Sequence, residues 1–402
     1  MIPATLVAAA TFLLWCLLSG RMDRWGVSAP LVMVLAGGAV GIGAHGAIAE
    51  AINTGAAQRA AEIILAVLLF VDATHVRGSL LGRHPRLAAR SLLIGIPVGL
   101  ILSVAVGWLL LPHLGWSVLL LVACVIAPID FASAPALLRD RRVPSRVRDV
   151  LTVESGYTDG LITPVFLFAM YWAGPAHGGD DDPAPALLAA APQAAIALAV
   201  GAALGAAIAA GVRYSERTGL ATASGRSLAI AATPLLTYAA AVGLGGNGFV
   251  AAFVCGIVYR LRRGTETADD VGLTDDVGFL LAAAMWFVFG SVAIVGIFDG
   301  VDWRTLVFVL AALTVLRVVP VGVAMLGSGL PRRQVLGLGW LRPRGTSTIV
   351  FALIAFNTLP DGPVADLTLT VAVLVVLGSV VLHTVGVPVT IAGHDRRVRS
   401  RA

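Results

Sequence analysis

Two acidic residues, Glu154 and Asp159, lie within the run VESGYTDG at positions 153–160, and apolar residues flank this run on both sides. A third acid, Asp130, lies between Pro128 and Pro135 in the apolar stretch just upstream. Ionisable side chains at membrane depth are costly, so each of them is a candidate functional residue. These three carboxylates are the main candidates for the chemistry of this chain.

Asp159 is predicted to carry a proton or a cation. A low-dielectric site disfavours the charged form of a carboxylic acid, so a buried aspartate can hold a proton near neutral pH and release it when a cation arrives. Ser155 lies one helical turn before Asp159 on the same face, and its hydroxyl could coordinate that cation. Thr158, one turn after Glu154, could do the same. The alternative is a buried acid that only hydrogen-bonds a hydroxyl in the core.

Asp130 is predicted to form part of the same cation site. A helix interrupted by prolines frees backbone carbonyl groups beside the Asp130 carboxylate. Such hard oxygen ligands suit small alkali cations, whereas transition metals favour imidazole or thiolate ligands. We therefore predict a monovalent cation at Asp130 and Asp159, and no cofactor. The alternative for Asp130 is an acid that caps a helix.

Glu154 is predicted to form a structural ion pair with Arg317, which lies in the apolar sequence LRVVP at positions 316–320. A buried arginine keeps its charge and needs a partner. Glu154 is five residues from Asp159, so the two acids point in different directions from one helix. We expect the pair with Arg317 to hold two helices together.

Three further residues are secondary candidates. Asp72 lies at span depth near the inner end of its apolar stretch, where it could simply reach the surface. Arg344 lies in an interrupted span close to the C-terminus. His383 could titrate near neutrality, although a lone histidine in a bundle is more often a packing residue.

The composition indicates that all these residues lie in a polytopic helical membrane protein. The chain has 402 residues, of which 58% are hydrophobic and 13% are charged, and its mean hydropathy is +0.91. Apolar runs of about 17–25 residues, the length that crosses the hydrocarbon core as a helix, recur from end to end. The three cysteines fall inside apolar runs and predict neither a disulfide nor a metal framework.

The apolar runs predict an all-α fold with about thirteen transmembrane helices. The spans are predicted at 2–20, 28–49, 59–76, 87–111, 115–138, 147–173, 185–212, 226–243, 247–261, 277–298, 303–327, 335–358 and 366–391. With the N-terminus outside, 23 of the 28 arginines fall on the inner segments and only Arg59 and Arg304 on the outer ones. This distribution follows the positive-inside rule and places the C-terminus in the cytoplasm, with the chain in the cell (inner or plasma) membrane.

Two of the spans are interrupted. Pro128 and Pro135 break span 5 around Asp130, and three glycines and Pro343 break span 12 around Arg342 and Arg344. Free backbone groups at membrane depth are tolerated only where they are buried in protein or line a cavity. Two broken helices that run in opposite directions are typical of transporters built from inverted repeats, in which these helices cross at the binding site.

The chain resembles the NhaP-type sodium/proton antiporters, relatives of the animal sodium/hydrogen exchangers, over nearly its whole length. Five stretches carry the resemblance: Ile129-Asp130 for the family's Thr-Asp, ESGYTDG (154–160) for its Glu-Ser-x-x-Asn-Asp-Gly, Arg317 for its buried arginine, Pro343-Arg344-Gly345 for its Leu-Arg-Gly, and GFVAAFVCG (248–256) for its Gly-x-x-Ala-x-Phe-x-x-Gly. Ile129 and Thr158 depart from the pattern, since the family usually has Thr and Asn there.

This resemblance implies a secondary transporter that exchanges sodium or lithium for a proton and contributes to pH homeostasis. Thr158 keeps the single-acid state that implies electroneutral exchange, whereas Ile129 lacks the hydroxyl group and leaves potassium/proton exchange open. The resemblance also implies a homodimer with interface helices at 1–84 and 222–300 and a moving core at 85–175 and 301–395. A loop and linker helix at 176–221 and a cytoplasmic tail at 396–402 complete this division.

Other classes of protein fit the sequence less well. An ion-coupled symporter for an organic solute would need a larger polar pocket than these few groups supply. Intramembrane aspartyl protease signatures are not intact, and a repeated channel filter motif is missing. The arginines lie mostly in loops between spans and do not indicate nucleic-acid binding. We therefore expect a transporter in a lipid bilayer, with monovalent cations and protons as its partners, and not an enzyme.

Overall fold

The computed structural model describes residues 2–25, 27–52, 54–76, 78–131, 142–174, 183–298, 301–360 and 362–399. In these ranges the regular structure is helical, apart from one isolated bridge between Ser79 and Gly82. The prediction of an all-α fold is confirmed. Pro135 and the 176–182 part of the predicted outer loop lie outside the described residues.

The helices follow the predicted spans closely. The first half of the chain contains α1 (Ile2–Trp25), α2 (Ala29–Ile52), α3 (Gly55–His75), α4 (Pro85–Arg90), α5 (Ile96–Leu110), α6 (Trp116–Ile126) and α8 (Ser145–Ala173). The second half contains α9 (Ala184–Thr218), α10 (Ala223–Gly243), α11 (Gly248–Arg263), α12 (Thr267–Asp270), α13 (Gly272–Phe298), α14 (Trp303–Leu313), α15 (Val315–Ala324), α16 (Arg332–Trp340), α17 (Thr346–Thr358) and α18 (Pro363–Arg399).

Six helical stretches of the described chain are long and apolar enough to cross a membrane, and three shorter apolar helices accompany them. The six stretches are Ala4–Met22, Pro85–Leu110, Ala190–Thr218, Gly272–Ser291, Trp303–Ala324 and Pro363–His383. The count of thirteen crossings stays a prediction, because breaks and polar side chains shorten the apolar part of the remaining helices.

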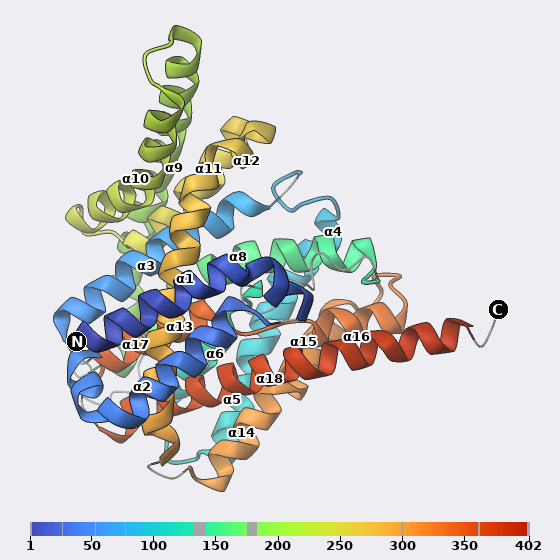
Figure 1. The fold of residues 1–402 in the computed structure, drawn as a ribbon. Coiled ribbons are helices and arrows are strands. Elements are labelled where there is room, and N and C mark those ends of the chain that lie inside the picture. Colours follow the sequence, from blue (N-terminus) through green and yellow to red (C-terminus); the bar gives the residue numbers. More distant parts are fainter. Residues whose placement is uncertain are drawn as a thin grey trace.

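Two groups of helices surround the central helix α8. On one side, α13 packs along α2, and α11 packs between α9 and α3. On the other side, α8 packs against α6, and α17 packs against α18. The rings of Phe166 in α8 and Phe351 in α17 stack with their centroids 4.6 Å apart. Figure 1 shows α9 and α10 as a hairpin that projects from the body of the molecule.

Four interruptions distinguish the structure from a bundle of straight helices. α6 ends at Ile126 and residues 127–130 are not helical, and residues 341–345 separate α16 from α17. These two breaks lie where the prolines and glycines predicted them. In addition, Ser91–Gly95 forms a π-helical segment between α4 and α5, and Thr314 separates α14 from α15. The apolar runs at 87–111 and 303–327 predict continuous helices at both of these places, and the structure differs there.

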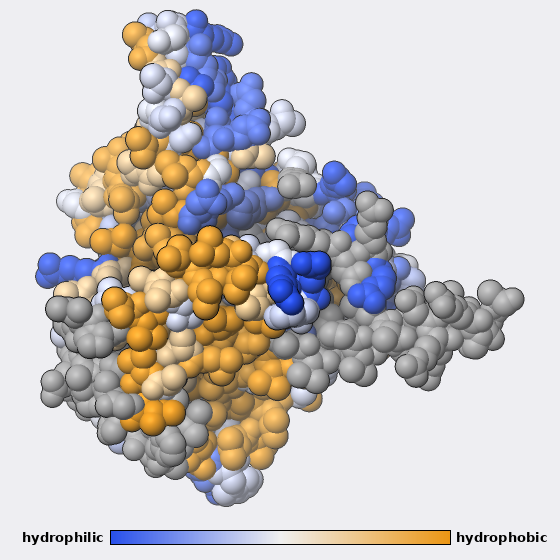
Figure 2. All heavy atoms as spheres, in the orientation of Figure 1, coloured by the Kyte–Doolittle hydropathy of each residue, from blue (hydrophilic) through white to orange (hydrophobic). Residues whose placement is uncertain are grey.

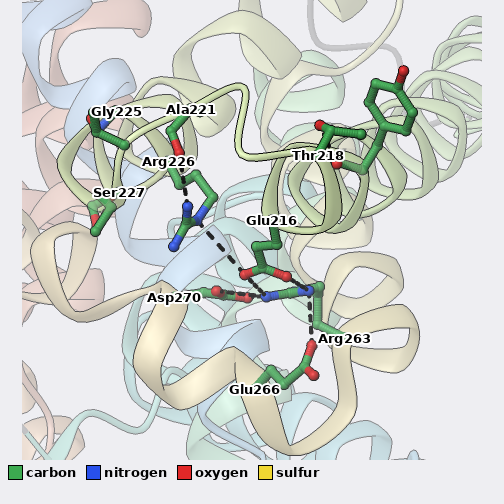
Figure 3. A network of polar contacts seen from close by, with 12 residues as sticks. Glu216, Thr218, Ala221, Gly225, Arg226, Ser227, Arg263, Glu266 and Asp270 are labelled. Carbon is green, nitrogen blue, oxygen red and sulfur yellow. Dashed lines mark hydrogen bonds and ion pairs between the residues drawn. The ribbon is translucent and has the colours of Figure 1, made fainter.

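An ion-pair network joins the ends of α9, α10, α11 and α12 (Figure 3). The Arg263 side chain, only 1% exposed, pairs with Asp270 at 2.6 Å, Glu216 at 2.7 Å and Glu266 at 2.8 Å. Arg226 of α10 lies 3.7 Å from the same Glu216 carboxylate. A buried guanidinium needs several acceptors, and this one has three carboxylates. The network therefore fixes the arginine-rich ends of these helices relative to one another.

The surface of the molecule also fits a membrane. Figure 2 shows hydrophobic residues along α1 and hydrophilic residues at its C-terminal end and at the tip of the α9–α10 hairpin. The exposed apolar side chains of α1 include Leu6, Leu13 and Leu17. The C-terminal end of α1 carries Arg21 and Arg24, which were predicted to lie on the cytoplasmic side.

Candidate ion-binding site

Asp159 lies near the middle of α8 and is 2% exposed. Its Oδ2 atom accepts a hydrogen bond from the hydroxyl of Ser347, in the first turn of α17. The backbone amide of Ile129, in the break after α6, also stabilises this carboxylate. Its Oδ1 atom is buried and has no hydrogen-bond partner among the described residues. The break after α6, the start of α17 and the centre of α8 thus meet at the Asp159 carboxylate.

Asp130 connects the two interrupted segments. Its backbone N–H donates to the carbonyl of Pro343 at 3.0 Å, and its Oδ2 accepts from the backbone N–H of Thr346 at 2.6 Å. Thr346 is the first residue of α17, so the carboxylate satisfies a free amide at a helix N-terminus. A Cβ atom on Gly345 would lie 2.5 Å from Asp130 Oδ2, so only glycine allows this approach.

Arg344 binds the opposite end of the first break. Its Nη1 atom donates to the carbonyl of Pro128 at 2.6 Å and to the carbonyl of Ala127. Its backbone N–H donates to Ser379 Oγ of α18 at 2.8 Å. Carbonyl groups at the end of a helix have no partner within it and carry partial negative charge, which a cation stabilises. Arg344 therefore donates hydrogen bonds to the backbone carbonyls that have no helical partner after the end of α6.

Ile129 departs from the resembled family pattern, and its side chain lies away from the candidate ligands. It is 1% exposed and belongs to an apolar cluster with Val147, Val150 and Leu151 of α8. What Ile129 presents to Asp159 is its backbone amide. The missing hydroxyl is therefore replaced by an apolar side chain that packs in the core.

The structure pairs Glu154 with Arg342 and not with Arg317, so the predicted partner was wrong. Glu154 Oε1 lies 3.0 Å from Arg342 Nη2 and also accepts from the hydroxyl of Ser91 in the π-helical segment. Arg317 Nη2 instead lies 3.5 Å from Ser379 Oγ, and its other guanidinium nitrogens, Nε and Nη1, have no partner among the described residues. The error arose because three arginines lie in apolar sequence, and only the break at 341–345 decides which one reaches α8.

Ser155 and Thr158 differ in their surroundings. Ser155 is half-buried, and no hydrogen bond of its hydroxyl is found in the described part of the chain. Thr158 is buried and donates to the carbonyl of Glu154 at 2.6 Å, on its own helix. Thr158 lines a cavity of about 30 Å³ together with Arg342 and Arg344. That volume accommodates a water molecule beside polar groups. Thr158 thus bonds its own helix and lines the cavity beside the two arginines.

Asp72 lies in α3, where this helix approaches α8 most closely. A Cβ atom on Gly156 would lie 2.8 Å from the carbonyl oxygen of Asp72. The Asp72 carboxylate is half-buried and interacts electrostatically with Asp159 and Asp130. The structure thus brings this secondary candidate close to the two main ones.

Four polar residues that contact the candidate residues were not predicted. Ser347 bonds Asp159, Ser91 bonds Glu154, Arg342 pairs with Glu154, and Ser379 contacts both Arg317 and Arg344. His383 is buried one turn after Ser379, and its Nδ1 lies 2.8 Å from the Ser379 carbonyl. The three serines could not have been recognised from the sequence, because serine is common in such helices. Arg342 could have been recognised, because it is a charged residue in an interrupted apolar span.

A cavity of about 1170 Å³ opens against the N-terminal half of α8. It lies between the C-terminal ends of α3 and α11, the N-terminal half of α8 and the start of α13. Its charged lining residues are His75, Arg83, Arg148, Asp149, Arg260 and Asp275. Thr152 and Val153 of α8, which immediately precede Glu154, form part of its wall. The cavity therefore reaches α8 from the arginine-rich end of the helices.

A family model described as "Sodium/hydrogen exchanger, transmembrane" matches residues 6–393. The chain belongs to the sodium/hydrogen exchanger family. The exchanger is thus a multi-pass membrane antiporter, and the resemblance noted from its motifs is confirmed. Its family exchanges monovalent cations for protons, which agrees with an interior that holds buried carboxylates and backbone oxygens.

Solved structures support the same fold. The exchanger is similar to the sodium proton antiporter MjNhaP1 from Methanocaldococcus jannaschii at pH 8, with 18% identity and a TM-score of 0.75, over 95% of this chain and 99% of that chain. An electron-microscopy structure of MjNhaP1 gives 19% identity and a TM-score of 0.69, over 98% and 96% of the two chains. At this identity the likeness shows the fold alone. The comparison with curated proteins gives no match.

Proposed function

We propose that the exchanger carries sodium or lithium in one direction and a proton in the other, with both competing for Asp159. The observation that carries this proposal is the buried Asp159 carboxylate, whose Oδ2 accepts from Ser347 and whose Oδ1 has no hydrogen-bond partner among the described residues. A buried carboxylate is stable when a proton or a cation neutralises it. Either ligand satisfies the free oxygen, so binding one excludes the other.

The neighbouring groups have distinct roles in this proposal. Ser155, one turn before Asp159, supplies a hydroxyl ligand, and Asp72 of α3 adds negative charge near the site. Asp130 fixes the two interrupted segments by binding Thr346 and adds negative charge near the ion. The Glu154–Arg342 pair is structural and neutral in sum. One titrating acid at the ion then gives one cation for one proton, which is electroneutral exchange.

Transport requires the site to face each side of the membrane in turn. We place the moving core at 85–175 and 301–395 and the static interface at 1–84 and 222–300. The large cavity reaches α8 at the arginine-rich end of the helices, which supports a conformation open toward the side that we assign to the cytoplasm. Only a neutralised core can cross the apolar barrier, because an uncompensated buried charge is costly. That cost couples the two transported ions.

The interface helices also suggest a homodimer in the cell membrane, with the N-terminus outside and the C-terminus in the cytoplasm. Arginine-rich segments at the cavity end support this orientation. We propose no cofactor, because the carboxylate oxygens of Asp159 and Asp130 are hard ligands of the kind that suits alkali cations.

Potassium/proton exchange is a second candidate, and Ile129 is the observation that favours it. Its side chain packs in an apolar cluster, so the site has no hydroxyl ligand at this position. Fewer protein ligands select less strongly for a small, strongly hydrated cation such as sodium or lithium. The choice between these ions can be made with the same experiment that tests the main proposal.

The test is proton efflux from acid-loaded proteoliposomes that contain the full chain, after addition of NaCl, LiCl or KCl. We expect Na+ and Li+ to dissipate the gradient at a rate that an imposed membrane potential does not change. A response to K+ alone would support the second candidate. No response to any salt from folded protein would contradict cation/proton exchange.

Replacing Asp159 with Asn is expected to abolish this exchange, because an amide can neither bind a proton nor neutralise a cation. Asp302→Asn is the matched control, since Asp302 is exposed before α14 and far from α8 in the sequence. Exchange should be lost in the first variant and retained in the second, with both variants folded. Exchange by the Asp159→Asn variant would show that another group carries the proton.

A further inference from the structure

Trp286 of α13 is completely buried, with a relative exposure of 0%. Its indole Nε1–H donates a hydrogen bond of 2.9 Å to the hydroxyl oxygen of Thr346. The ring also packs edge-on against Phe289, one turn further along α13. Trp286 belongs to none of the sequence motifs described above, and the proposed exchange at Asp159 does not use it.

Thr346 connects this tryptophan to the ion site. The backbone N–H of Thr346 binds Asp130 at 2.6 Å, while its side-chain oxygen accepts from Trp286. Ser347, the next residue, bonds Asp159. Trp286 therefore holds the first turn of α17, the turn that presents one group to each of the two candidate aspartates.

The Trp286–Thr346 bond joins two parts of the molecule that the proposed transport cycle must separate. Trp286 belongs to α13, within the proposed static interface, and Thr346 begins α17, within the proposed moving core. A buried indole N–H that loses its acceptor pays the desolvation cost of an unpaired polar group. A bond across a sliding boundary stabilises the arrangement in which it forms and opposes the others.

We propose that Trp286 is a positioning residue of the exchanger: its indole N–H holds Thr346, and through it Asp130, while the cavity at the arginine-rich end is open. The bond breaks as the core moves to the opposite side. The Trp286–Thr346 hydrogen bond therefore stabilises the state with the open cavity and lowers the population of the state with the closed cavity. This inference rests on the proposed function for the movement of the core, but the bond itself does not depend on the transported ion.

The test measures the two conformations directly, with spin labels on opposite walls of the cavity. Thr152→Cys in α8 and Thr265→Cys, in the turn after α11, both line this cavity. Cys16→Ala removes the exposed native thiol, whereas Cys124 and Cys255 are buried. Distance distributions in lipid nanodiscs then give the ratio of wide to narrow cavity populations. This measurement requires no transport activity.

We expect Trp286→Phe, which keeps an aromatic ring but loses the N–H, to lower the wide-to-narrow ratio by about twofold to tenfold, the range of one net hydrogen bond. Thr346→Val removes the acceptor and should lower the ratio equally. Thr346→Ser keeps the hydroxyl and should behave like the unmodified chain. The double variant Trp286→Phe/Thr346→Val should show no further change, because both substitutions remove the same bond.

An unchanged ratio in both Trp286→Phe and Thr346→Val would overturn the proposal, as would an equal shift in Thr346→Ser. Because Thr346→Val tests the bond from the other partner, misfolding of Trp286→Phe would not prevent a decision. If the ratio shifts but proteoliposomes show no cation/proton exchange, the inference about Trp286 stands and the proposed function fails.

Discussion

At the residue scale, buried charges determine the organisation of this site. Glu154, Asp159 and Arg317 are buried in apolar helices, and Arg342 and Arg344 are buried in the break between α16 and α17. Uncompensated charge is expensive in such surroundings, so each one needs a counter-charge, a set of hydrogen bonds or a transported ion. Glu154 has Arg342 as its counter-charge, whereas Asp159 forms no ion pair with a described residue, which is why we propose an ion or a proton as its partner.

The Glu154–Arg342 pair leads to a prediction on stability. Glu154→Gln and Arg342→Gln should each lower the free energy of unfolding by about 3–5 kcal/mol, because each leaves one buried charge unpaired. The double variant should cost clearly less than the sum of the two. Thermal unfolding in detergent measures this coupling. When Glu154→Gln is combined with Arg317→Gln instead, the losses of unfolding free energy should add. A larger coupling of Glu154 to Arg317 than to Arg342 would contradict the observed pairing.

The Ser347 hydroxyl should tune the competition between cation and proton at Asp159. A hydrogen bond to a carboxylate favours its ionised form. Without this bond the proton is held more tightly, so Ser347→Ala should raise the KM for Na+ by about twofold to tenfold at constant pH. Ser347→Thr keeps the hydroxyl and should leave the KM for Na+ unchanged. Ser227→Ala, which removes an exposed serine hydroxyl of α10, is the control and should also leave it unchanged. A changed kcat with an unchanged KM would argue against this role.

At the scale of the elements, the site depends on two interruptions that contact each other. Asp130 of the first binds Pro343 and Thr346 at the second, and Arg344 of the second binds the carbonyls of Ala127 and Pro128 in the first. Each interruption supplies the polar groups that the other lacks. Neither segment could remain in an apolar environment alone, because its free backbone groups would be unsatisfied.

Gly345→Ala tests this contact. The added Cβ would lie 2.5 Å from the Asp130 carboxylate, so the two segments must separate. We expect cation/proton exchange to fall at least tenfold, since Asp130 and Thr346 would lose their alignment. Gly337→Ala in α16 is the matched control, because no atom lies within 4 Å of its added Cβ. Equal exchange in both variants, measured in proteoliposomes, would show that the close contact is unimportant.

At the scale of the whole molecule, the two groups of helices are held by different forces. α2 packs along α13, and α11 packs with α3 and α9, through extended helix-to-helix contact. The ion pairs around Arg263 hold together the arginine-rich ends of the four helices α9, α10, α11 and α12 (Figure 3). The other group contains both interruptions and the buried Glu154, Asp159, Arg317, Arg342 and Arg344. This division fits a rigid part and a moving part of one transporter.

The proposed homodimer can be tested on α1, where Leu13 and Leu17 are 61% and 75% exposed. Without a hydrophobic driving force in lipid, helices associate through close packing, so Leu13→Ala/Leu17→Ala should lower the dimer fraction. Ile101→Ala/Leu109→Ala in α5 is the matched control, with similar exposure in the proposed core. Light scattering in detergent should give twice 41.3 kDa for the unmodified protein. A mass of one chain for the unmodified protein would contradict the proposed homodimer.

The sequence determined the helices and most of the candidate residues, because these depend on local composition. Apolar runs gave the helix ranges, and proline and glycine gave the interruptions at 127–130 and 341–345. Charges in apolar sequence identified Asp130, Glu154 and Asp159, since such charges are costly wherever the chain folds.

Only the tertiary structure decided which groups meet. The sequence favoured Arg317 as the partner of Glu154, but the break before α17 places Arg342 there instead. Ser91, Ser347 and Trp286 are distant from residues 154–159 in the chain, and no local pattern marks them as neighbours of the site. The breaks at Thr314 and Ser91–Gly95 were also unpredicted, because packing between helices determines them. Pairing across helices is a property of three-dimensional packing, which hydropathy and spacing along one chain do not encode.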